Sequence, residues 1–246
     1  MILELDCGNS FIKWRVIPVT GGVPLIQGIA SQPVDIVQAL LGQGLGKIPR
    51  CRLVSVRSDA ETQVVMDVLS ESLSLSVTKA CPAERLAGVV NGYRDQQRLG
   101  LDRWLAIVAA YDMCREACLV IDLGTAITVD LVARDGTHLG GYIAPGVALL
   151  RGRLLAHTRR IQYDSEETAL VLSDFSPGRS TAEAVDRGCL IMARSYVCSQ
   201  ITFAESYLGG DFVTYVTGGD APLVADVREV KCVADLVFRG LALACP

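Results

Sequence analysis

Two short segments of the sequence place an aspartate, a glycine and a hydroxyl or amide side chain directly after an apolar run. The first is Asp6-Cys7-Gly8-Asn9-Ser10, followed by Lys13, and the second is Asp122-Leu123-Gly124-Thr125-Ala126. Glycine lets the backbone come close to an anionic ligand, and consecutive backbone N–H groups in such a turn form a concave anion site. Both segments are therefore candidate phosphate-binding turns.

The side chains around the first turn suit a nucleotide. Asn9, Ser10 and Lys13 offer an amide, a hydroxyl and an ammonium group to phosphate oxygens. Asp6 can hold Mg²⁺ directly or through water, because Mg²⁺ takes few carboxylates and keeps several waters. Thr125 of the second turn can contact a phosphate from the other side, and positioning of this kind does most of the work in phosphoryl transfer. The plainer alternative for either segment alone is a strand–turn–strand corner with an acid in the turn.

A third candidate is Gly100-Leu101-Asp102-Arg103, which opens the apolar segment from Leu101 to Tyr111, a predicted helix. A helix N-terminus favours the ionised form of Asp102. A carboxylate beside a γ-phosphate can accept the proton of a substrate hydroxyl. Arg103 can bind a substrate carboxylate with its planar fork. The alternative is a helix-start acid and a surface charge pair.

The elements that carry the two turns repeat at nearly half the chain length. Asp6 matches Asp122 and Gly8 matches Gly124, with the two copies 116 residues apart. In each copy, apolar runs and turn residues alternate in a way that predicts three strands joined by turns. The repeat predicts two similar α/β lobes, with domains at residues 1–115 and 116–246, each opening with antiparallel strands.

Apolar spacing predicts further elements. In the helix expected at residues 61–69, the apolar spacing places Val64, Val65, Val68 and Leu69 on one face. A short strand at 213–216 ends in Thr217-Gly218-Gly219-Asp220, where the two glycines can let the backbone approach a purine or ribose. That segment alone is also compatible with an ordinary helix-entry turn. Other helices are predicted at residues 33–41, 181–208 and 236–244.

Composition and charge exclude several classes of protein. Half of the 246 residues are hydrophobic and a fifth are charged, but no apolar run approaches the ~18 residues of a membrane span. The net charge of −4 and the lack of a long basic run disfavour nucleic-acid binding. Nine cysteines without a Cys-x-x-Cys pair, and only two histidines, argue against a disulfide framework and a zinc site. The first residues lack the basic region of a signal peptide, which predicts a cytoplasmic protein.

Taken together, these segments resemble the type III pantothenate kinases of the actin, heat-shock chaperone, acetate-kinase and sugar-kinase superfamily. The family motif Asp-x-Gly-Asn-[Thr/Ser]-x-x-Lys is matched by residues 6–13, and Gly-x-Asp-Arg by residues 100–103. The motif Asp-x-Gly-Thr-Ala-x-Thr-x-Asp is matched by residues 122–130. Residues 140–146 and 217–221 resemble two further family segments, so five ordered motifs extend over most of the chain.

The resemblance implies a fold of two ribonuclease H-like lobes, a duplicated actin-like ATPase domain with a nucleotide cleft between the lobes. It implies ATP-dependent phosphorylation of pantothenate to 4'-phosphopantothenate, the first step of coenzyme A biosynthesis. The implied cofactors are ATP with Mg²⁺ and a monovalent cation, K⁺ or NH₄⁺. The implied assembly is a homodimer with the substrate pocket near its interface, to which we expect residues 101–111 and 181–208 to contribute.

The resemblance also implies roles for single residues. Asp102 is similar to the family's catalytic proton acceptor, and Asp122 to its monovalent-cation ligand. One departure is Gln96, which stands where many members have proline and predicts a less rigid loop around Tyr93. The implied pantothenate contacts are Tyr93, Gly100, Leu101, Asp102, Arg103 and Thr181. The implied ATP contacts are Asp6, Cys7, Gly8, Asn9, Ser10, Phe11, Ile12, Lys13 and Thr125.

Two alternative functions stay open from the sequence. One is another small-molecule kinase of the same superfamily, such as a sugar kinase, and the other is a non-catalytic accessory regulator with this fold. Fold alone does not decide, because the superfamily also includes chaperones and cytoskeletal filaments. The presence of Asp6, Asp102, Asp122 and Thr125 favours a working kinase.

Overall fold

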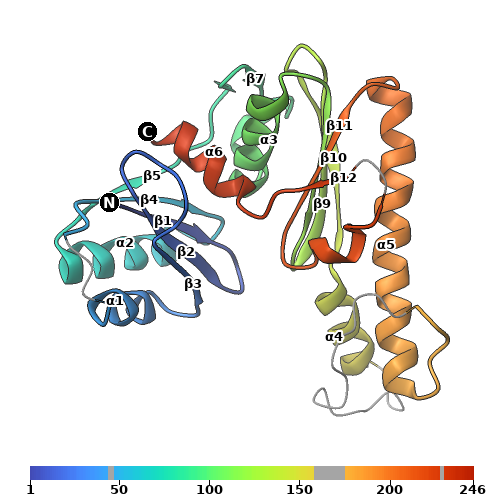
Figure 1. The fold of residues 1–246 in the computed structure, drawn as a ribbon, viewed down its shortest axis with the longest axis horizontal. Helices are drawn as coiled ribbons and strands as arrows, with labels where there is room; N and C mark the ends of the chain where they lie inside the picture. Colours follow the sequence, from blue (N-terminus) through green and yellow to red (C-terminus); the bar gives the residue numbers. More distant parts are fainter. Residues whose placement is uncertain (44–46, 158–174, 228–229) are drawn as a thin grey trace. The chain divides into compact units, whose positions relative to one another are not determined.

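A computed structural model shows that the chain forms two compact α/β units (Figure 1). One unit comprises residues 1–109 with residues 236–246, and the other comprises residues 110–235. The half-length repeat thus predicted the fold class correctly. These units group residues by their contacts in space, whereas the predicted lobes divide the sequence by its repeat. The lobe boundary between residues 115 and 116 therefore stays a prediction. The structure describes residues 1–43, 47–157, 175–227 and 230–246.

The first unit is built on a five-stranded mixed sheet with the strand order β3-β2-β1-β4-β5. The strands are β1 (Ile2–Cys7), β2 (Ile12–Ile17), β3 (Ile26–Ala30), β4 (Arg50–Ser55) and β5 (Ser76–Lys79). The β1–β2 and β2–β3 pairs are antiparallel, whereas β1–β4 and β4–β5 are parallel. Parallel pairing brings the carboxyl ends of β1 and β4 to the same edge of the sheet, where the first turn begins.

Two helices, α1 (Pro33–Leu41) and α2 (Asp59–Leu73), cover one face of this sheet (Figure 1). Alternation along β1 directs Leu3 and Leu5 into the apolar core that these helices close. In α2 the buried positions are Thr62, Val65 and Leu69, spaced three and four residues apart as one face of a helix requires. Val64 is 57% exposed, so the prediction that it shares one face with Val65 and Leu69 was wrong: it lies about 100° round the helix from Val65.

The other face of the first sheet carries a buried ionic row. Glu4, Arg15 and Arg52 are direct neighbours across β2, β1 and β4, and each is less than a tenth exposed. Glu4 accepts hydrogen bonds from Arg15 Nε and, at 2.7 Å, from Arg52 Nε. Helix α6 (Leu236–Ala244) covers this row: the Arg15 guanidinium stacks on Phe238 at 4.5 Å, and Arg52 Nη1 donates to the Cys245 carbonyl at 2.9 Å.

The next segment of the chain connects the first sheet to the second. It contains a small hairpin, β6 (Arg85–Leu86) with β7 (Val89–Val90), a 3₁₀ turn η1 (Gln96–Arg98) and helix α3 (Leu101–Cys114). The apolar side chains of α3 from Trp104 to Tyr111 are buried within the chain. An all-round apolar helix is expected to be buried, and α3 therefore presents little surface to a partner.

The second unit repeats the first sheet, with the order β10-β9-β8-β11-β12 and the same sequence of antiparallel and parallel pairings. Its long helix α5 (Thr181–Leu208) packs on one face (Figure 1), where Leu119, Ile121 and Leu123 join the apolar core. The remaining elements are β8 (Cys118–Leu123), β9 (Ala126–Val132), β10 (His138–Pro145), α4 (Val147–His157), β11 (Val213–Thr217), η3 (Ala221–Val224) and β12 (Val230–Cys232).

The opposite face of the second sheet carries a different buried pair. His138 Nε2 and Asp130 Oδ1 lie 2.9 Å apart, and both side chains are almost fully buried. Asp130 lies beside Val120 on β8, which in turn lies beside Tyr215 on β11. Within the described parts of the chain, no helix is long and apolar enough to cross a membrane.

Candidate functional site

The first turn joins β1 to β2, and the strand register brings Asp6 opposite Lys13. The side chains of Asn9, Ser10 and Phe11 are exposed at the turn. The neighbouring Cys7 and Ile12 side chains are fully buried in the core, so any contact they make with ATP is through the backbone. Burial, with a contribution from the Asp6 carboxylate, raises the pKa of the Cys7 thiol to about 12, and this thiol stays protonated near neutral pH.

An arginine outside the recognised motifs holds the first turn. Arg57 follows β4, and its Nε–H donates to the carbonyl oxygen of Gly8 at 2.8 Å. The Val56 N–H donates to the Cys7 carbonyl at 3.1 Å, which carries the β1–β4 ladder up to the turn. The turn is therefore fixed from the neighbouring parallel strand as well as by its own hairpin.

Tyr93, Asp102 and Arg103 come together in the first unit. Asp102 lies in the first turn of α3, as predicted, and is half-buried. Arg103 is 6% exposed; its Nη1 donates to the Tyr93 hydroxyl at 2.8 Å, and its guanidinium lies 5.6 Å from the centre of the Tyr93 ring. A buried guanidinium fixed in this way is a preorganised site for a carboxylate. Gly100 precedes the helix, and Leu101 begins it with a buried side chain.

The loop that carries Tyr93 is organised by Asn91, which is 5% exposed. Asn91 Nδ2 donates to the carbonyls of Ala83 and Gln96, at 3.5 and 3.4 Å, and its Oδ1 accepts from the Tyr93 N–H at 3.0 Å. Its backbone N–H donates to the Glu84 carbonyl at 2.9 Å. One amide side chain thus connects both ends of the loop with Tyr93 itself.

The second turn, Gly124–Thr125, joins β8 to β9 and is enclosed by backbone from elsewhere in its unit. The Gly146 N–H, just before α4, donates to the Thr125 carbonyl at 3.0 Å. A Cβ added at Gly146 would collide with the backbone of the second turn. It would lie 3.0 Å from the Thr125 carbonyl carbon and closer still to backbone oxygens of that turn. Asp122 is half-buried and Thr125 exposed, as expected for groups that meet a ligand at a strand end.

The segment after β11 approaches the second turn still more closely. Gly218 has φ +97°, and a Cβ there would collide with the Asp122 carboxylate and with the Leu123 carbonyl. The Asp220 N–H donates to that same carbonyl at 3.0 Å. Burial raises the pKa of Asp220, and the nearby positive charge of Arg151 partly offsets the shift. Gly218 thus serves close backbone packing beside Asp122, whereas a Cβ at Gly219 would meet nothing within 4 Å.

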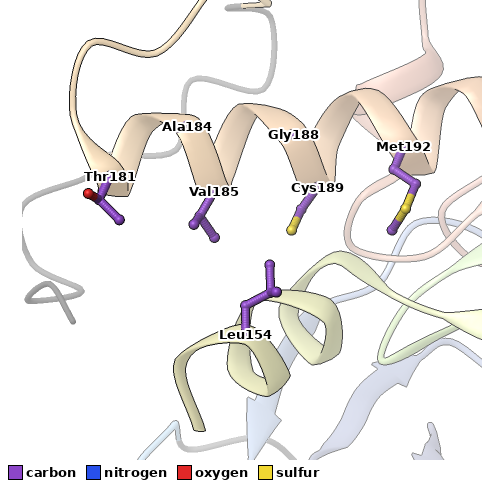
Figure 2. A pocket seen from close by; sticks show the side chains of 7 residues that line it. All are labelled: Leu154, Thr181, Ala184, Val185, Gly188, Cys189 and Met192. Carbon is purple, nitrogen blue, oxygen red and sulfur yellow. The ribbon is translucent and has the colours of Figure 1, made fainter. Parts of the chain in front are cut away.

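Thr181 begins α5 and lines a pocket of about 440 Å³ between α4 and α5 (Figure 2). Along one side of α5, Thr181, Val185, Cys189 and Met192 point toward Leu154 of α4, with the threonine hydroxyl at one end. The pocket is lined mainly by apolar atoms, and Ala184 and Gly188 complete the lining. A hydroxyl at the end of an apolar pocket suits a ligand that is largely apolar with a polar end.

The structure brings together Asp6 with Lys13, and Tyr93 with Arg103, in the first unit, and Asp122 with Thr125 and Gly218 in the second. Thr181 lies apart, in the α4–α5 pocket. Among the described residues, no group of three or more His, Cys, Asp or Glu side chains forms a metal cluster. Sequence reasoning missed Arg57 and Asn91. Arg57 had one usable signal: the carboxyl end of a strand parallel to β1 lies beside the first turn.

Comparison with protein families and known proteins gives a full-length match. A family model described as type III pantothenate kinase matches residues 2–202. A type III pantothenate kinase of Ectopseudomonas mendocina is 55% identical over 247 residues, which covers 100% of this chain and 99% of that protein. Another, of Pseudomonas paraeruginosa, is 54% identical over 248 residues with the same coverage.

Solved structures agree on the fold. The ethanolamine utilization protein EutJ of Carboxydothermus hydrogenoformans matches with a TM-score of 0.57 and 16% identity, over 98% of this chain and 89% of that chain. The MamK double helical filament matches with a TM-score of 0.50 and 10% identity, over 99% and 98%. At these identities the likeness concerns the fold alone, which is that of the actin-like ATPases.

Proposed function

The chain belongs to the type III pantothenate kinase family, and we propose that it carries out ATP-dependent phosphorylation of pantothenate, to 4'-phosphopantothenate, through the residues described above. It is a phosphotransferase whose acceptor is a primary hydroxyl. Pantothenate carries both that hydroxyl and a carboxylate, so the site needs a proton acceptor and a cationic anchor. The proposal includes action in the cytoplasm, as the first step of coenzyme A biosynthesis.

The observation that carries the assignment of roles is the arrangement of Asp102, Arg103 and Tyr93. The Arg103 guanidinium is buried and hydrogen-bonded to Tyr93 at 2.8 Å, which prepares it to bind the pantothenate carboxylate. Asp102 is the neighbouring residue, in the first turn of α3, where the helix dipole favours a negative charge. Asp102 accepts the hydroxyl proton as the phosphoryl group is transferred. Gly100 and Leu101 set the start of the helix that presents both side chains.

The two turns bind ATP. Lys13, Asn9 and Ser10 of the first turn, together with its backbone N–H groups, hold phosphate oxygens, and Thr125 of the second turn contributes a hydroxyl. The donor set fits Mg²⁺, because Asp6 offers one half-buried carboxylate beside an exposed turn, and Mg²⁺ takes few carboxylates and keeps several waters. Bound Mg²⁺ would neutralise charge on the phosphates.

Asp122 is the proposed ligand of K⁺ or NH₄⁺. Its carboxylate is half-buried at the end of β8, next to the Leu123 carbonyl and the close-packed backbone at Gly218. Oxygen donors of this kind suit a monovalent cation, which would offset the repulsion between Asp122 and nearby phosphate oxygens. Rates measured in matched K⁺ and Na⁺ buffers at constant Mg²⁺ test this; equal rates would contradict it.

A homodimer is the proposed assembly, with Thr181 close to the pantothenate pocket. Helix α5 exposes Ile191, Met192, Phe203 and Tyr207, whereas the other segment expected to contribute, residues 101–111, is largely buried within the chain. Exposed apolar side chains along one helix favour burial against a partner. Sedimentation at micromolar concentration is expected to give a dimer, and a monomer would contradict the proposal.

The experiment that tests the function replaces Asp102 by Asn and Arg103 by Ala in separate variants. Asp102→Asn keeps the size of the side chain but cannot accept the proton, so kcat is expected to fall by about 10²–10⁴ with ATP affinity unchanged. Arg103→Ala is expected mainly to raise the KM for pantothenate. The measurements are ADP release with pantothenate and calorimetric ATP binding.

An acceptor panel completes the test. ADP release with pantothenate, N-acetylmannosamine and glucose distinguishes a pantothenate kinase from another small-molecule kinase and from a non-catalytic regulator. Phosphorylation of a sugar in preference to pantothenate would overturn the substrate assignment. Near-full turnover by Asp102→Asn would overturn its role as the base.

A further inference from the structure

Arg57 belongs to none of the motifs identified in the sequence, yet it forms a hydrogen bond with the first phosphate turn. Strand β4 runs parallel to β1 with Ser55 opposite Cys7, so the residues just after both strands meet at one edge of the sheet. There the Nε–H of Arg57 donates to the Gly8 carbonyl at 2.8 Å. Across the described residues this is the one hydrogen bond that the guanidinium makes.

The backbone of Arg57 is itself fixed. Its N–H donates to Ser55 Oγ at 3.2 Å, and Ser55 Oγ lies 2.7 Å from Thr62 Oγ1. The Thr62 hydroxyl donates in turn to the Ser58 carbonyl at 2.9 Å, and Ser58 caps α2. Ser55 and Thr62 are both less than a tenth exposed. The side chain of Arg57 therefore starts from a rigid corner between β4 and α2.

The geometry of the peptide unit gives this contact a consequence for the turn. In a trans peptide the carbonyl of one residue and the N–H of the next point in opposite directions. No cis peptide bond occurs in the described parts of the chain. Because the Gly8 carbonyl points to Arg57, the Asn9 N–H points away from it, to the side of the turn opposite Arg57. Glycine at position 8 would otherwise let this peptide rotate with little resistance.

We propose that Arg57 is a positioning residue of the first phosphate turn, which fixes the Gly8–Asn9 peptide so that the Asn9 N–H faces the phosphate oxygens of a nucleoside triphosphate. The inference rests on the proposed function for the identity of the ligand. Its physical basis is preorganisation: a backbone donor already aimed at an anion does not have to be ordered when the anion binds.

Two substitutions separate this role from the alternatives. Arg57→Ala removes the bond to Gly8, and calorimetric Kd for Mg²⁺-ATP, measured without pantothenate, is expected to rise about ten-fold, the loss expected for one hydrogen bond. Arg57→Gln keeps an N–H donor but no charge, and its Kd is expected to stay closer to the wild type than that of Arg57→Ala. The KM for pantothenate is expected to change little in either variant.

The matched control is Arg134→Ala, which removes an exposed guanidinium paired with Glu116 at 2.7 Å in the second unit. It should leave ATP binding and turnover unchanged. A merely structural role for Arg57 would lower the unfolding temperature without separating Arg57→Gln from Arg57→Ala in ATP affinity. Both tryptophans, Trp14 and Trp104, belong to the first unit, so their fluorescence reports its stability directly.

The outcomes are distinguishable. An unchanged ATP Kd in Arg57→Ala would overturn the proposal, and so would equal weakening by Ala and Gln, which would point to charge in place of peptide orientation. If Arg57→Ala fails to fold, Arg57→Gln carries the comparison alone: an ATP Kd raised as much as ten-fold would overturn the proposal. If the wild type binds ATP but does not phosphorylate pantothenate, the proposed function fails while the role of Arg57 is still tested by ATP binding.

Discussion

The two strand-end turns, Gly8–Asn9 in the first unit and Gly124–Thr125 in the second, occupy the same place in the two sheets but are held by different means. In the first unit a side chain holds the turn: Arg57, just after β4, donates a hydrogen bond to the Gly8 carbonyl. In the second unit backbone groups hold the turn. The Gly146 N–H donates to the Thr125 carbonyl, and Gly218 packs against Asp122 and Leu123 too closely to leave room for a Cβ. The side-chain contact at Gly8 can be weakened gradually by substitution, whereas the backbone contacts at Gly146 and Gly218 tolerate almost no added atom.

The rows behind the turns differ as well. Strand register places Glu4, Arg15 and Arg52 side by side in the first sheet, and Val120, Asp130 and Tyr215 at the matching positions in the second. The first row is a salt-bridged triad, while in the second Asp130 pairs with His138 on the next strand. Topology and the strand-end aspartates are thus common to both units, and the packing behind them is not.

The largest expected effect tests the first row. Glu4→Gln removes the carboxylate that Arg15 and Arg52 share in the buried row, and the free energy of unfolding is expected to fall by about 3–5 kcal/mol. Urea denaturation followed by tryptophan fluorescence measures this in the first unit. Val120→Ala at the matching position removes the equivalent of two methylene groups and is expected to cost roughly 1.6 kcal/mol by circular dichroism. If Glu4→Gln lowers the free energy of unfolding no more than Val120→Ala does, the buried ionic row is no more important for stability than the matching row of the second sheet.

The next effect tests the backbone contact in the second unit. Gly218→Ala introduces a Cβ where φ is +97° and where the Asp122 carboxylate and Leu123 carbonyl already lie, at a cost of about 2–4 kcal/mol in stability. ATP affinity is expected to fall with it. Gly219→Ala is the control, because nothing lies within 4 Å of its Cβ position. Gly8→Ala in the first turn, with its nearest contact at 3.2 Å, should be milder than Gly218→Ala. The reverse order would contradict the comparison.

A smaller effect is expected from the buried pair of the second sheet. Asp130→Ala leaves His138 Nε2 without its 2.9 Å partner, and the free energy of unfolding should fall by about 1–3 kcal/mol. The cost is lower than for Glu4 because an imidazole can be neutral and a guanidinium cannot. The double variant Asp130→Leu/His138→Phe should be less destabilised than Asp130→Ala. The two single variants, Asp130→Leu and His138→Phe, complete the comparison. If the loss of unfolding free energy in the double variant equals the sum of the two single losses, the two side chains do not interact.

The smallest effect concerns the exposed ion pairs of the two units. Lys79 lowers the pKa of Asp59, and Arg194 lowers the pKa of Asp226. A depressed carboxyl pKa contributes stability that is present above the unfolded value, near pH 4, and is lost as pH falls through the folded value. Asp59→Asn and Asp226→Asn should therefore differ from wild type only slightly at pH 7, and not at all at lower pH. A difference that grows on acidification would contradict this assignment.

The features that the sequence predicted correctly are those with local signals. An apolar run followed by Asp-x-Gly predicts a strand and a turn wherever it occurs, so β1, β8 and their turns followed from Asp6 and Asp122 alone. Helix α5 begins at Thr181, as the apolar spacing predicted. The place of Asp102 in the first turn of α3 was predicted correctly, because Asp102 stands at the start of the apolar segment in the sequence.

The features that escaped prediction depend on contacts between distant segments. Arg57 meets Gly8 across 49 residues only because β4 pairs in parallel with β1. The pairing of Glu4 with two arginines needs the register of three strands. Val64 was expected on the same face as Val65 because of the apolar spacing of residues 61–69, but the buried face of α2 contains Thr62, whose hydroxyl bonds Ser55 and Ser58. The roles assigned to the site residues, from the first turn to Asp102, Asp122 and Thr181, all remain predictions.

Helix α6 gives the first unit an unusual order of completion during protein synthesis. Residues 1–109 leave the ribosome first, yet Phe238 and the Cys245 carbonyl, which cover Arg15 and Arg52, are made only after residues 110–235. At ordinary translation rates that interval is roughly 6–25 seconds. During this time one face of the nascent sheet stays open to water. Ions on that face are well hydrated while they wait, whereas an apolar row there would leave the nascent chain prone to aggregate.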